Sequence, residues 1–143
     1  MEPQSRLSAN RAGAVAETIV STRLIRAGFN VARPEIPCRY DLVVDLDGDL
    51  VRTQVKRGFE DSRDETLRVN LLGSVHKGAT EYESVQYTAD DIDAFAIYDP
   101  INDTVYWLWF EEAPATELRR KYNSLVEHTL GRKLKSRGVA GQS

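Results

Sequence analysis

The chain has 143 residues, of which 41% are hydrophobic and 29% are charged. This length is usual for one domain, and the composition is that of a globular protein. The longest apolar stretch is far shorter than the ~18 residues of a membrane span, which excludes a helical membrane protein. The first residues lack the apolar run of a signal peptide, and a single cysteine cannot form an internal disulfide, so we expect a cytoplasmic protein. One cysteine and two histidines are too few for a four-ligand zinc site, so any metal must be bound through oxygen.

Charge is distributed unevenly along the chain, although the net charge is only -3. Residues 1–40 carry six basic and three acidic side chains, and residues 113–143 carry seven and two. Residues 81–112 carry nine acidic side chains and no basic one. This asymmetry favours basic surfaces at both ends that contact a polyanion, although a run of Arg and Lys is also commonly a solvated face.

The first predicted element is a helix that begins after a cap at Ser8 or Asn10 and ends at about Ala27, before Gly28. Its apolar residues recur at helical spacing, so one stripe of the helix faces a core. At about 100° per residue, Glu17 falls on the margin of that stripe. An acid is therefore directed at the edge of the interior.

Two β-branched segments on either side of the Asp-Gly pair at residues 47–48 predict a β-hairpin. The register set by this turn places Asp41 opposite Gln54. Because side chains alternate between the faces of a strand, Lys56 shares the face of Gln54 and lies one diagonal step from Asp41. The hairpin therefore groups Asp41, Gln54 and Lys56 on one surface.

A strand over residues 67–71 and a polar connection over residues 72–89 are expected next. The length of that connection indicates a functional loop, in which His76 contacts a substrate, acts as a base or is an ordinary exposed histidine. The apolar segments 92–98 and 104–110 predict a second hairpin with both faces covered, at the centre of the sheet.

The last predicted element is a closing helix from about Pro114 to Leu130. Its apolar face would consist of Leu118, Tyr122, Leu125 and Val126. We expect residues 132–143 to form a disordered basic tail. Residues 1–131 are then the single domain.

Three segments in this order carry a resemblance to a known family: Gly13-Ala14-Val15-Ala16-Glu17, Tyr40-Asp41 and Gln54-Val55-Lys56. They resemble the motifs of the PD-(D/E)XK nuclease superfamily. Together with residues 89–98, the third segment is similar to the group I intron-associated homing endonucleases of that class. The resemblance covers residues 10–125 and implies a restriction-endonuclease-like α/β core, a mostly antiparallel mixed sheet flanked by helices. Tyr40 stands where the family has Pro, and Gln54 stands where it commonly has an acid, but the intron-associated branch resembles this chain in carrying Gln there.

The resemblance implies that Glu17, Asp41, Gln54 and Lys56 are catalytic. Oxygen ligands suit Mg²⁺, which Mn²⁺ can replace, and a plausible shell consists of Asp41, Glu17, the Gln54 amide oxygen and the Val55 carbonyl. A divalent ion activates water, neutralises the phosphate and stabilises the leaving oxygen, while Lys56 orients the water or neutralises the phosphate. Each of these residues alone fits an ordinary surface role, and only their convergence favours catalysis.

Double-stranded DNA is the predicted partner, and basic residues near the proposed site and at the two ends of the domain are candidates for contacts with its backbone. These candidates are Arg11, Arg57, Arg68, Lys77, Arg119, Arg120 and Lys121. The last three lie beside the apolar stripe of the predicted closing helix, where they can meet either phosphate or a partner subunit.

We therefore predict a Mg²⁺-dependent DNA endonuclease of the homing type, assembled as a homodimer or homotetramer because cutting both strands needs two sites. One alternative is a nuclease similar to archaeal Holliday-junction resolvases, which normally carry an acid at the position of Gln54. Another is a DNA-binding module with a silent active site, which would keep DNA affinity without metal-dependent cleavage.

Overall fold

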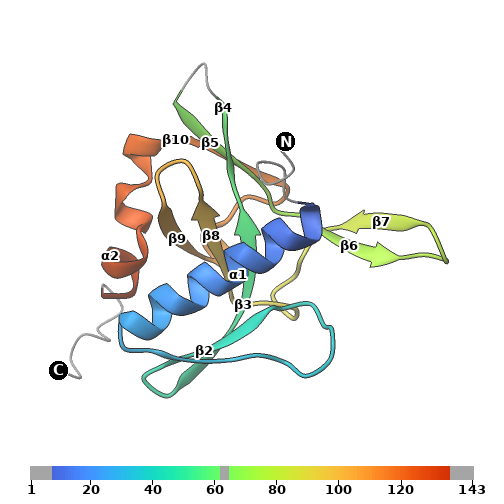
Figure 1. The fold of residues 1–143 in the computed structure, drawn as a ribbon, viewed down its shortest axis with the longest axis horizontal. Coiled ribbons are helices and arrows are strands. Elements are labelled where there is room, and N and C mark those ends of the chain that lie inside the picture. The colour runs from blue at the N-terminus through green and yellow to red at the C-terminus, as the bar shows by residue number, and fades with distance from the viewer. Residues whose placement is uncertain (1–7, 62–64, 136–143) are drawn as a thin grey trace, which may run out of the picture.

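A computed structural model of the chain describes residues 8–61 and 65–135 (Figure 1). In chain order, the helices and strands of these residues are α1 (Ala9–Arg26), β1 (Asn30–Ala32), β2 (Leu42–Leu46), β3 (Asp49–Arg57), β4 (Phe59–Asp61), β5 (Thr66–Asn70), β6 (Gly73–His76), β7 (Tyr82–Val85), β8 (Ala94–Asp99), β9 (Thr104–Trp109), η2 (Phe110–Glu112), β10 (Glu117–Lys121), η3 (Tyr122–Ser124), η4 (Val126–His128) and α2 (Leu130–Lys135). The η elements are short 3₁₀ helices. Within the described ranges, we find no helix with the length and apolar character needed to cross a membrane.

Helix α1 forms as predicted. The Ser8 side chain caps it by accepting a hydrogen bond from the Arg11 backbone N–H (3.2 Å). Gly28, with φ +103°, provides the left-handed conformation in which the chain leaves the helix. Ala16, Val20 and Leu24 are buried against the sheet, so the helix lies across one of its faces (Figure 1).

The main sheet has the strand order β1-β2-β3-β8-β9. Its β3–β8 pair is parallel and its other pairs are antiparallel, which confirms the predicted mixed α/β core. Asp47 and Gly48 both have positive φ (58° and 102°), as a tight hairpin turn between β2 and β3 requires. Leu42 lies opposite Thr53, so the predicted hairpin register is also confirmed.

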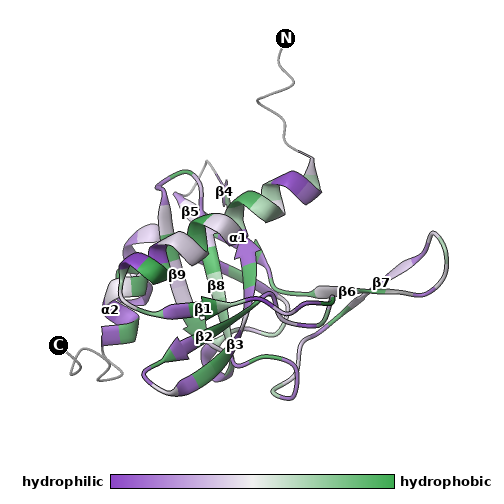
Figure 2. Ribbon diagram, turned by 60° about the horizontal axis from the view of Figure 1, so that its bottom comes forward, coloured by the Kyte–Doolittle hydropathy of each residue, from purple (hydrophilic) through white to green (hydrophobic). Residues whose placement is uncertain are grey.

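Two hydrophobic cores lie on the two faces of the main sheet. The first fills the space between the sheet and α1, and the second lies between the sheet and a smaller sheet of order β10-β5-β4. Every residue of β8 is buried, and Figure 2 shows the hydrophobic character of this strand. The predicted central position is correct for β8 and wrong for β9, which is at the end of the sheet, where Tyr106 forms a β-bridge with Thr129.

The predicted closing helix over residues 114–130 is wrong. Residues 117–121 form β10, which pairs with β5 so that Leu118 lies opposite Val69 in the second core. Strand pairing thus buries Leu118 without a helix, and Val126, on the predicted apolar face, is 46% exposed. The expectation of disorder is also wrong for residues 132–135, because they belong to α2, whose Leu134 is buried in the first core. Residues 136–143 lie outside the described ranges.

The long connection over residues 72–89 is not a structureless loop. Strands β6 and β7 pair as an antiparallel hairpin that projects from the body of the protein (Figure 1). Its exposed side chains include Val75 and Tyr82. The hairpin has no core on either side, which explains why its strands lack the apolar alternation on which the sequence prediction depended.

Candidate active site

Asp41 lies immediately before β2, where the hairpin register fixes it beside β3. Its backbone N–H donates to the Thr53 carbonyl (2.9 Å), and its carboxylate Oδ2 accepts a hydrogen bond from the Val55 N–H (2.9 Å). Burial raises the pKa of Asp41 to about 6. The Val55 hydrogen bond opposes this pKa shift, and the nearby Glu17 carboxylate adds to it. Asp41 is therefore a partly desolvated acid that interacts with a second acid, Glu17.

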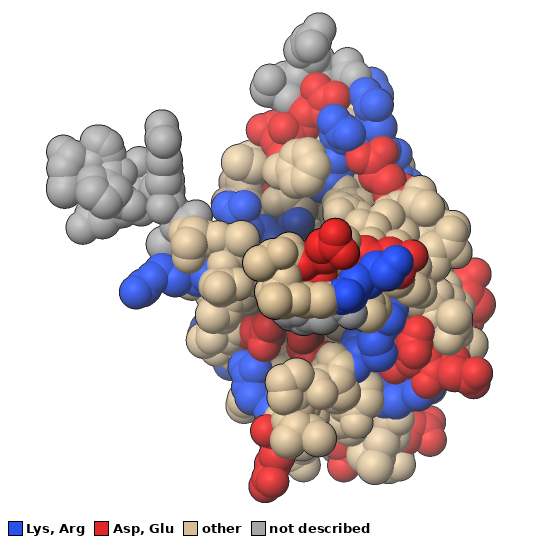
Figure 3. Space-filling model, turned by 90° about the vertical axis from the view of Figure 1, so that its right-hand side faces the viewer, with Lys and Arg blue, Asp and Glu red and all other residues tan. Residues whose placement is uncertain are grey.

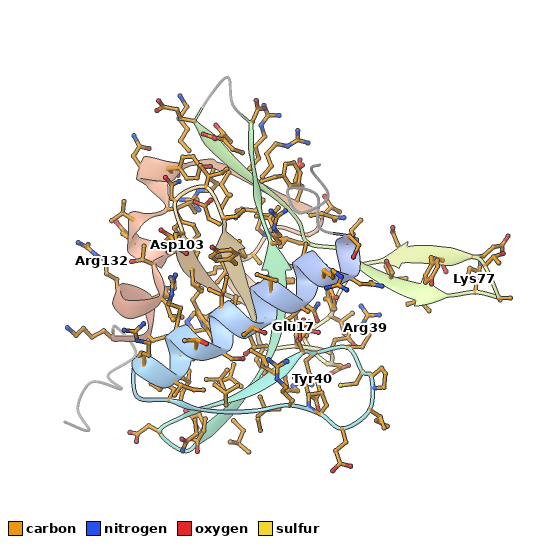
Figure 4. All side chains as sticks on the ribbon, in the orientation of Figure 1. Glu17, Arg39, Tyr40, Lys77, Asp103 and Arg132 are labelled. Carbon is orange, nitrogen blue, oxygen red and sulfur yellow. The ribbon has the colours of Figure 1, made fainter. Side chains whose placement is uncertain are left out.

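Glu17 reaches this place from α1, on the side that faces the chain before β2 (Figure 4). Its Oε1 forms an ion pair with Arg33 Nη1 (3.0 Å), and Arg33 Nη2 also donates to Ser21 Oγ (3.3 Å). The charge of Glu17 raises the pKa of Asp41, so the two carboxylates interact. The helix and the hairpin thus bring together the two acids that the sequence motifs indicated, and Arg33 is paired with Glu17.

Gln54 and Lys56 lie on the face of β3 opposite to Thr53 and Val55. The Gln54 Nε2 lies 3.5 Å from the Val55 carbonyl oxygen, and Lys56 Nζ donates to the Leu72 carbonyl (2.6 Å). Burial lowers the pKa of Lys56, against the attraction of Asp41, which raises it. The structure therefore groups Asp41, Gln54 and Lys56 beside the Val55 peptide, in the arrangement that the hairpin register predicts.

Two residues at this site were missed by the sequence analysis. The Tyr87 ring lies 4.5 Å from Arg39 Cζ and 5.4 Å from Lys56 Nζ, measured to the ring centroid. Burial raises the pKa of Tyr87 to about 12. Tyr87 lies in the connection between β7 and β8, where the sequence has no periodic signal. Arg39 precedes Asp41 by two residues, and this proximity was the only available signal.

The basic residues predicted to contact DNA are dispersed over the surface. Two of those on the smaller sheet are paired with acids: Arg68 with Glu117 (2.8 Å) and Arg119 with Asp61 (3.1 Å). Arg120 donates to the Ser124 carbonyl (2.9 Å). The remaining four occupy exposed positions: Arg11 in the first turn of α1, Arg57 at the end of β3, Lys77 between β6 and β7, and Lys121 at the end of β10. Figure 3 shows basic and acidic side chains mixed over the face with the β6–β7 hairpin, so the charge segregation along the chain does not make this face uniformly basic.

The oxygen atoms beside Asp41 fit a hard divalent cation. The described ranges contain no group of three or more His, Cys, Asp and Glu side chains suited to a metal ion. The Asp41 carboxylate, however, interacts with that of Glu17 and is bonded to Val55, whose carbonyl lies beside the Gln54 amide; these are also oxygen donors of the kind that Mg²⁺ accepts. The raised pKa of Asp41 reflects negative charge and burial that a cation would compensate.

Comparisons with known proteins agree with this geometry. A family profile described as PD-(D/E)XK endonuclease matches residues 7–133. The fold is similar to that of the bacterial homing endonuclease I-Ssp6803I, with a TM-score of 0.75 over 96% of this chain and 99% of that one, at 18% sequence identity. A comparison with curated proteins gives no match. The resemblance inferred from the sequence motifs is therefore confirmed.

Proposed function

Starting from the fact that the chain belongs to the PD-(D/E)XK endonuclease family, we propose that it hydrolyses phosphodiester bonds in double-stranded DNA at the site around Asp41. The observation that carries this proposal is the position of Asp41. Its carboxylate is anchored to the Val55 N–H, interacts with Glu17 and lies close enough to Lys56 for the two charges to affect each other's pKa. Two interacting acids and a lysine can together hold a metal ion and bind a phosphate, which metal-assisted hydrolysis of a phosphodiester uses.

Asp41, Glu17, the Gln54 amide oxygen and the Val55 carbonyl are the groups that would hold Mg²⁺, or Mn²⁺ in its place. When bound, such an ion supplies water activation at neutral pH and compensation of the charge on the phosphate and the leaving oxygen. Arg33 holds Glu17 at the rim, and its charge lowers the pKa of Asp41, which partly offsets the repulsion between the acids. The chain thus supplies two acids that are already held in place by Val55 and Arg33.

Lys56 is the cationic group of the site, and its ammonium is oriented by the bond to the Leu72 carbonyl. An ammonium has three donors and no acceptor, so two N–H groups are available to a phosphate oxygen or to the attacking water. Gln54 lies with its amide beside the Val55 carbonyl. A half-turn of this amide exchanges its NH₂ group and its oxygen, so Gln54 can adapt to a cation without moving its backbone.

Cutting both strands requires two sites, so we expect a symmetric homodimer or homotetramer that acts on DNA in the cytoplasm. Six of the seven basic candidates are proposed to contact the DNA backbone; Arg120 is the exception, because its guanidinium donates to the Ser124 carbonyl.

A cleavage selection tests this function. Linear duplexes with a randomised central region are incubated with the protein in Mg²⁺, in Mn²⁺ and in EDTA, and the cleaved ends are sequenced. We expect a defined set of cleaved sequences in Mg²⁺ and Mn²⁺ and none in EDTA or with Asp41→Asn. Binding of the library without cleavage in either metal would instead identify a silent DNA-binding module.

A further inference from the structure

We propose that Arg39 binds a DNA phosphate beside the bond that is cut and that Tyr87 positions it there. This inference rests on the proposed function, and it adds a phosphate-binding residue that neither the motifs nor the family match assigns. It also explains why an aromatic side chain lies between two cations at the edge of the Asp41 site.

The first argument is the position of Arg39. Arg39 precedes Asp41 by two residues, and Figure 4 shows Arg39 and Tyr40 on the same side of α1 as Glu17, which lies in the middle of that helix. Arg39 Cζ and Lys56 Nζ lie 4.5 Å and 5.4 Å from the centroid of the same Tyr87 ring, so the two cations act on the same small volume. A phosphate that reaches Lys56 therefore also comes under the field of Arg39.

The second argument is the state of the guanidinium. Its contacts with acceptors are long: Nη2 lies 3.4 Å from the Gln86 carbonyl and 3.7 Å from Asp91 Oδ2. The same Asp91 oxygen accepts a shorter hydrogen bond from the Thr88 N–H (2.9 Å), so Asp91 is bound more closely to its own turn than to Arg39. The Arg39 side chain is 31% exposed, and guanidinium groups bind phosphate through paired donors. The arrangement leaves the donors of Arg39 weakly satisfied at the edge of the site.

The third argument is the rigidity of the aromatic platform. The Tyr87 ring packs edge-to-face on Phe95 of β8, with 5.7 Å between centroids. It also lies so close to Gly73 that a Cβ added there would be 2.8 Å from the Tyr87 hydroxyl oxygen. Gly73 directly follows Leu72, whose carbonyl accepts from Lys56. The Tyr87 ring is therefore held in place by Phe95 and by the chain next to the carbonyl that binds Lys56. A cation that is already held over a rigid ring loses less conformational freedom when it binds an anion.

The test uses the full chain and measures DNA affinity and cleavage separately. Affinity for a duplex of random sequence is measured in EDTA at several salt concentrations for wild type, Arg39→Gln, Arg39→Lys, Tyr87→Phe and Tyr87→Leu. Single-turnover cleavage in Mg²⁺ is measured on a duplex recovered from the selection. Arg23→Gln is the matched control, because Arg23 pairs with Asp103 (2.7 Å), which Figure 4 labels on the other side of the molecule from Arg39. Thermal unfolding reports whether each variant is folded.

We expect Arg39→Gln to reduce the slope of log K against log salt by about 0.9, the value for one lost phosphate contact, and to slow cleavage by about tenfold or more. Arg39→Lys should keep the slope, since it keeps the charge. Tyr87→Phe should behave as wild type because it keeps the ring, whereas Tyr87→Leu should slow cleavage.

A wild-type slope in folded Arg39→Gln overturns the proposal, and so does wild-type cleavage by Tyr87→Leu. If wild type itself cleaves nothing, the proposed function fails, while the salt dependence in EDTA still decides whether Arg39 contacts phosphate. The two failures are therefore distinguishable.

Discussion

The Val55 backbone N–H donates a 2.9 Å hydrogen bond to the carboxylate of Asp41, which ties the start of β2 to the middle of β3. The bond fixes the acid against the peptide that precedes Lys56. Because both residues belong to one hairpin, the position of the carboxylate is set by strand pairing and by a tight turn. A site built on paired strands is held more precisely than one built on a loop.

Asp41→Asn is expected to abolish cleavage and to leave the fold and most DNA binding intact. The amide keeps an oxygen that can accept from Val55 but loses the negative charge that a divalent ion requires. Cleavage and duplex binding are measured side by side, with Asp45→Asn as a control on the same strand. Cleavage by Asp41→Asn at the wild-type rate would place the catalytic acid elsewhere.

The pKa of Asp41 predicts how the metal-free protein responds to pH. This pKa is about 6 in the folded protein against 3.8 for an aspartic acid that is fully exposed to water, so the folded state binds the proton more tightly. The resulting stabilisation is complete below pH 3.8 and is lost as the pH rises through about 6. Urea unfolding in EDTA should therefore show a component of the unfolding free energy that falls between these pH values.

Asp41→Asn removes this titrating group, so its unfolding free energy should lack that component. Addition of Mg²⁺ near pH 7 should stabilise wild type more than Asp41→Asn, since a ligand that binds only the folded state stabilises it. Identical pH profiles for the two proteins would mean that Asp41 is solvated and not desolvated beside Glu17.

Gln54→Glu is expected to tighten binding of divalent cations, because it adds a full negative charge beside the Val55 carbonyl. The measurement is a calorimetric titration of Mg²⁺ and Mn²⁺ into both proteins. Asp49→Asn, at the far end of β3, is the control for a general effect of charge. An unchanged affinity in Gln54→Glu would put residue 54 outside the metal shell.

The β2–β3 hairpin could be predicted because its information is local. The Asp-Gly turn fixes the register, and the register fixes which of Asp41, Gln54 and Lys56 share a face. Helix α1 is equally readable from its cap and its apolar stripe. The prediction for the β10 segment was wrong because its strand conformation comes from pairing with β5, about fifty residues earlier in the chain. The spacing of apolar residues within the segment cannot reveal such pairing.

The candidate site could be predicted only where it depends on the motifs. Tyr87 and the Leu72 carbonyl reach Lys56 through the chain that surrounds the β6–β7 hairpin, and no periodicity in that segment indicates where it returns. The partner of Glu17, Arg33, was visible in the sequence but had no assigned role. Long-range placement of polar side chains is what the sequence could not supply.

Asp93→Asn is expected to destabilise the protein by about 1–2 kcal/mol, since charged hydrogen bonds are lost at a partly exposed site. Both Asp93 carboxylate oxygens accept from the Arg52 side chain (2.9 and 3.1 Å), and Oδ2 also accepts from the Arg52 backbone N–H (2.8 Å). Arg52 in turn donates to the Ala89 and Asp90 carbonyls, so the pair fastens the chain before β8 to β3.

Asp90→Asn is the matched control for Asp93→Asn, because Asp90 contacts Arg52 through its backbone carbonyl, which the substitution keeps. Bonding to Arg52 lowers the pKa of Asp93, so its stabilisation should be present above pH 3.8 and lost as the pH falls below it. Equal stability of the two variants in urea would show that the pair contributes little.

The basic residues of β10 predict a difference in the salt dependence of DNA binding. Because side chains alternate on a strand, Arg119 and Lys121 share the exposed face of β10, whereas Arg120 turns toward Ser124 and donates to its carbonyl.

Neutralising Arg119 and Lys121 together should flatten the plot of log K against log salt by up to about 1.8, or 0.9 for each lost phosphate contact. Because Arg119 forms an ion pair with Asp61, its contribution to this change of slope should be the smaller of the two. Arg120→Gln should leave the slope unchanged. Both variants are compared on target and scrambled duplexes, because the loss of a phosphate contact should weaken binding to the two equally. A slope that changes only in Arg120→Gln would reverse this assignment, and no change in either variant would mean that this face contacts another protomer or solvent.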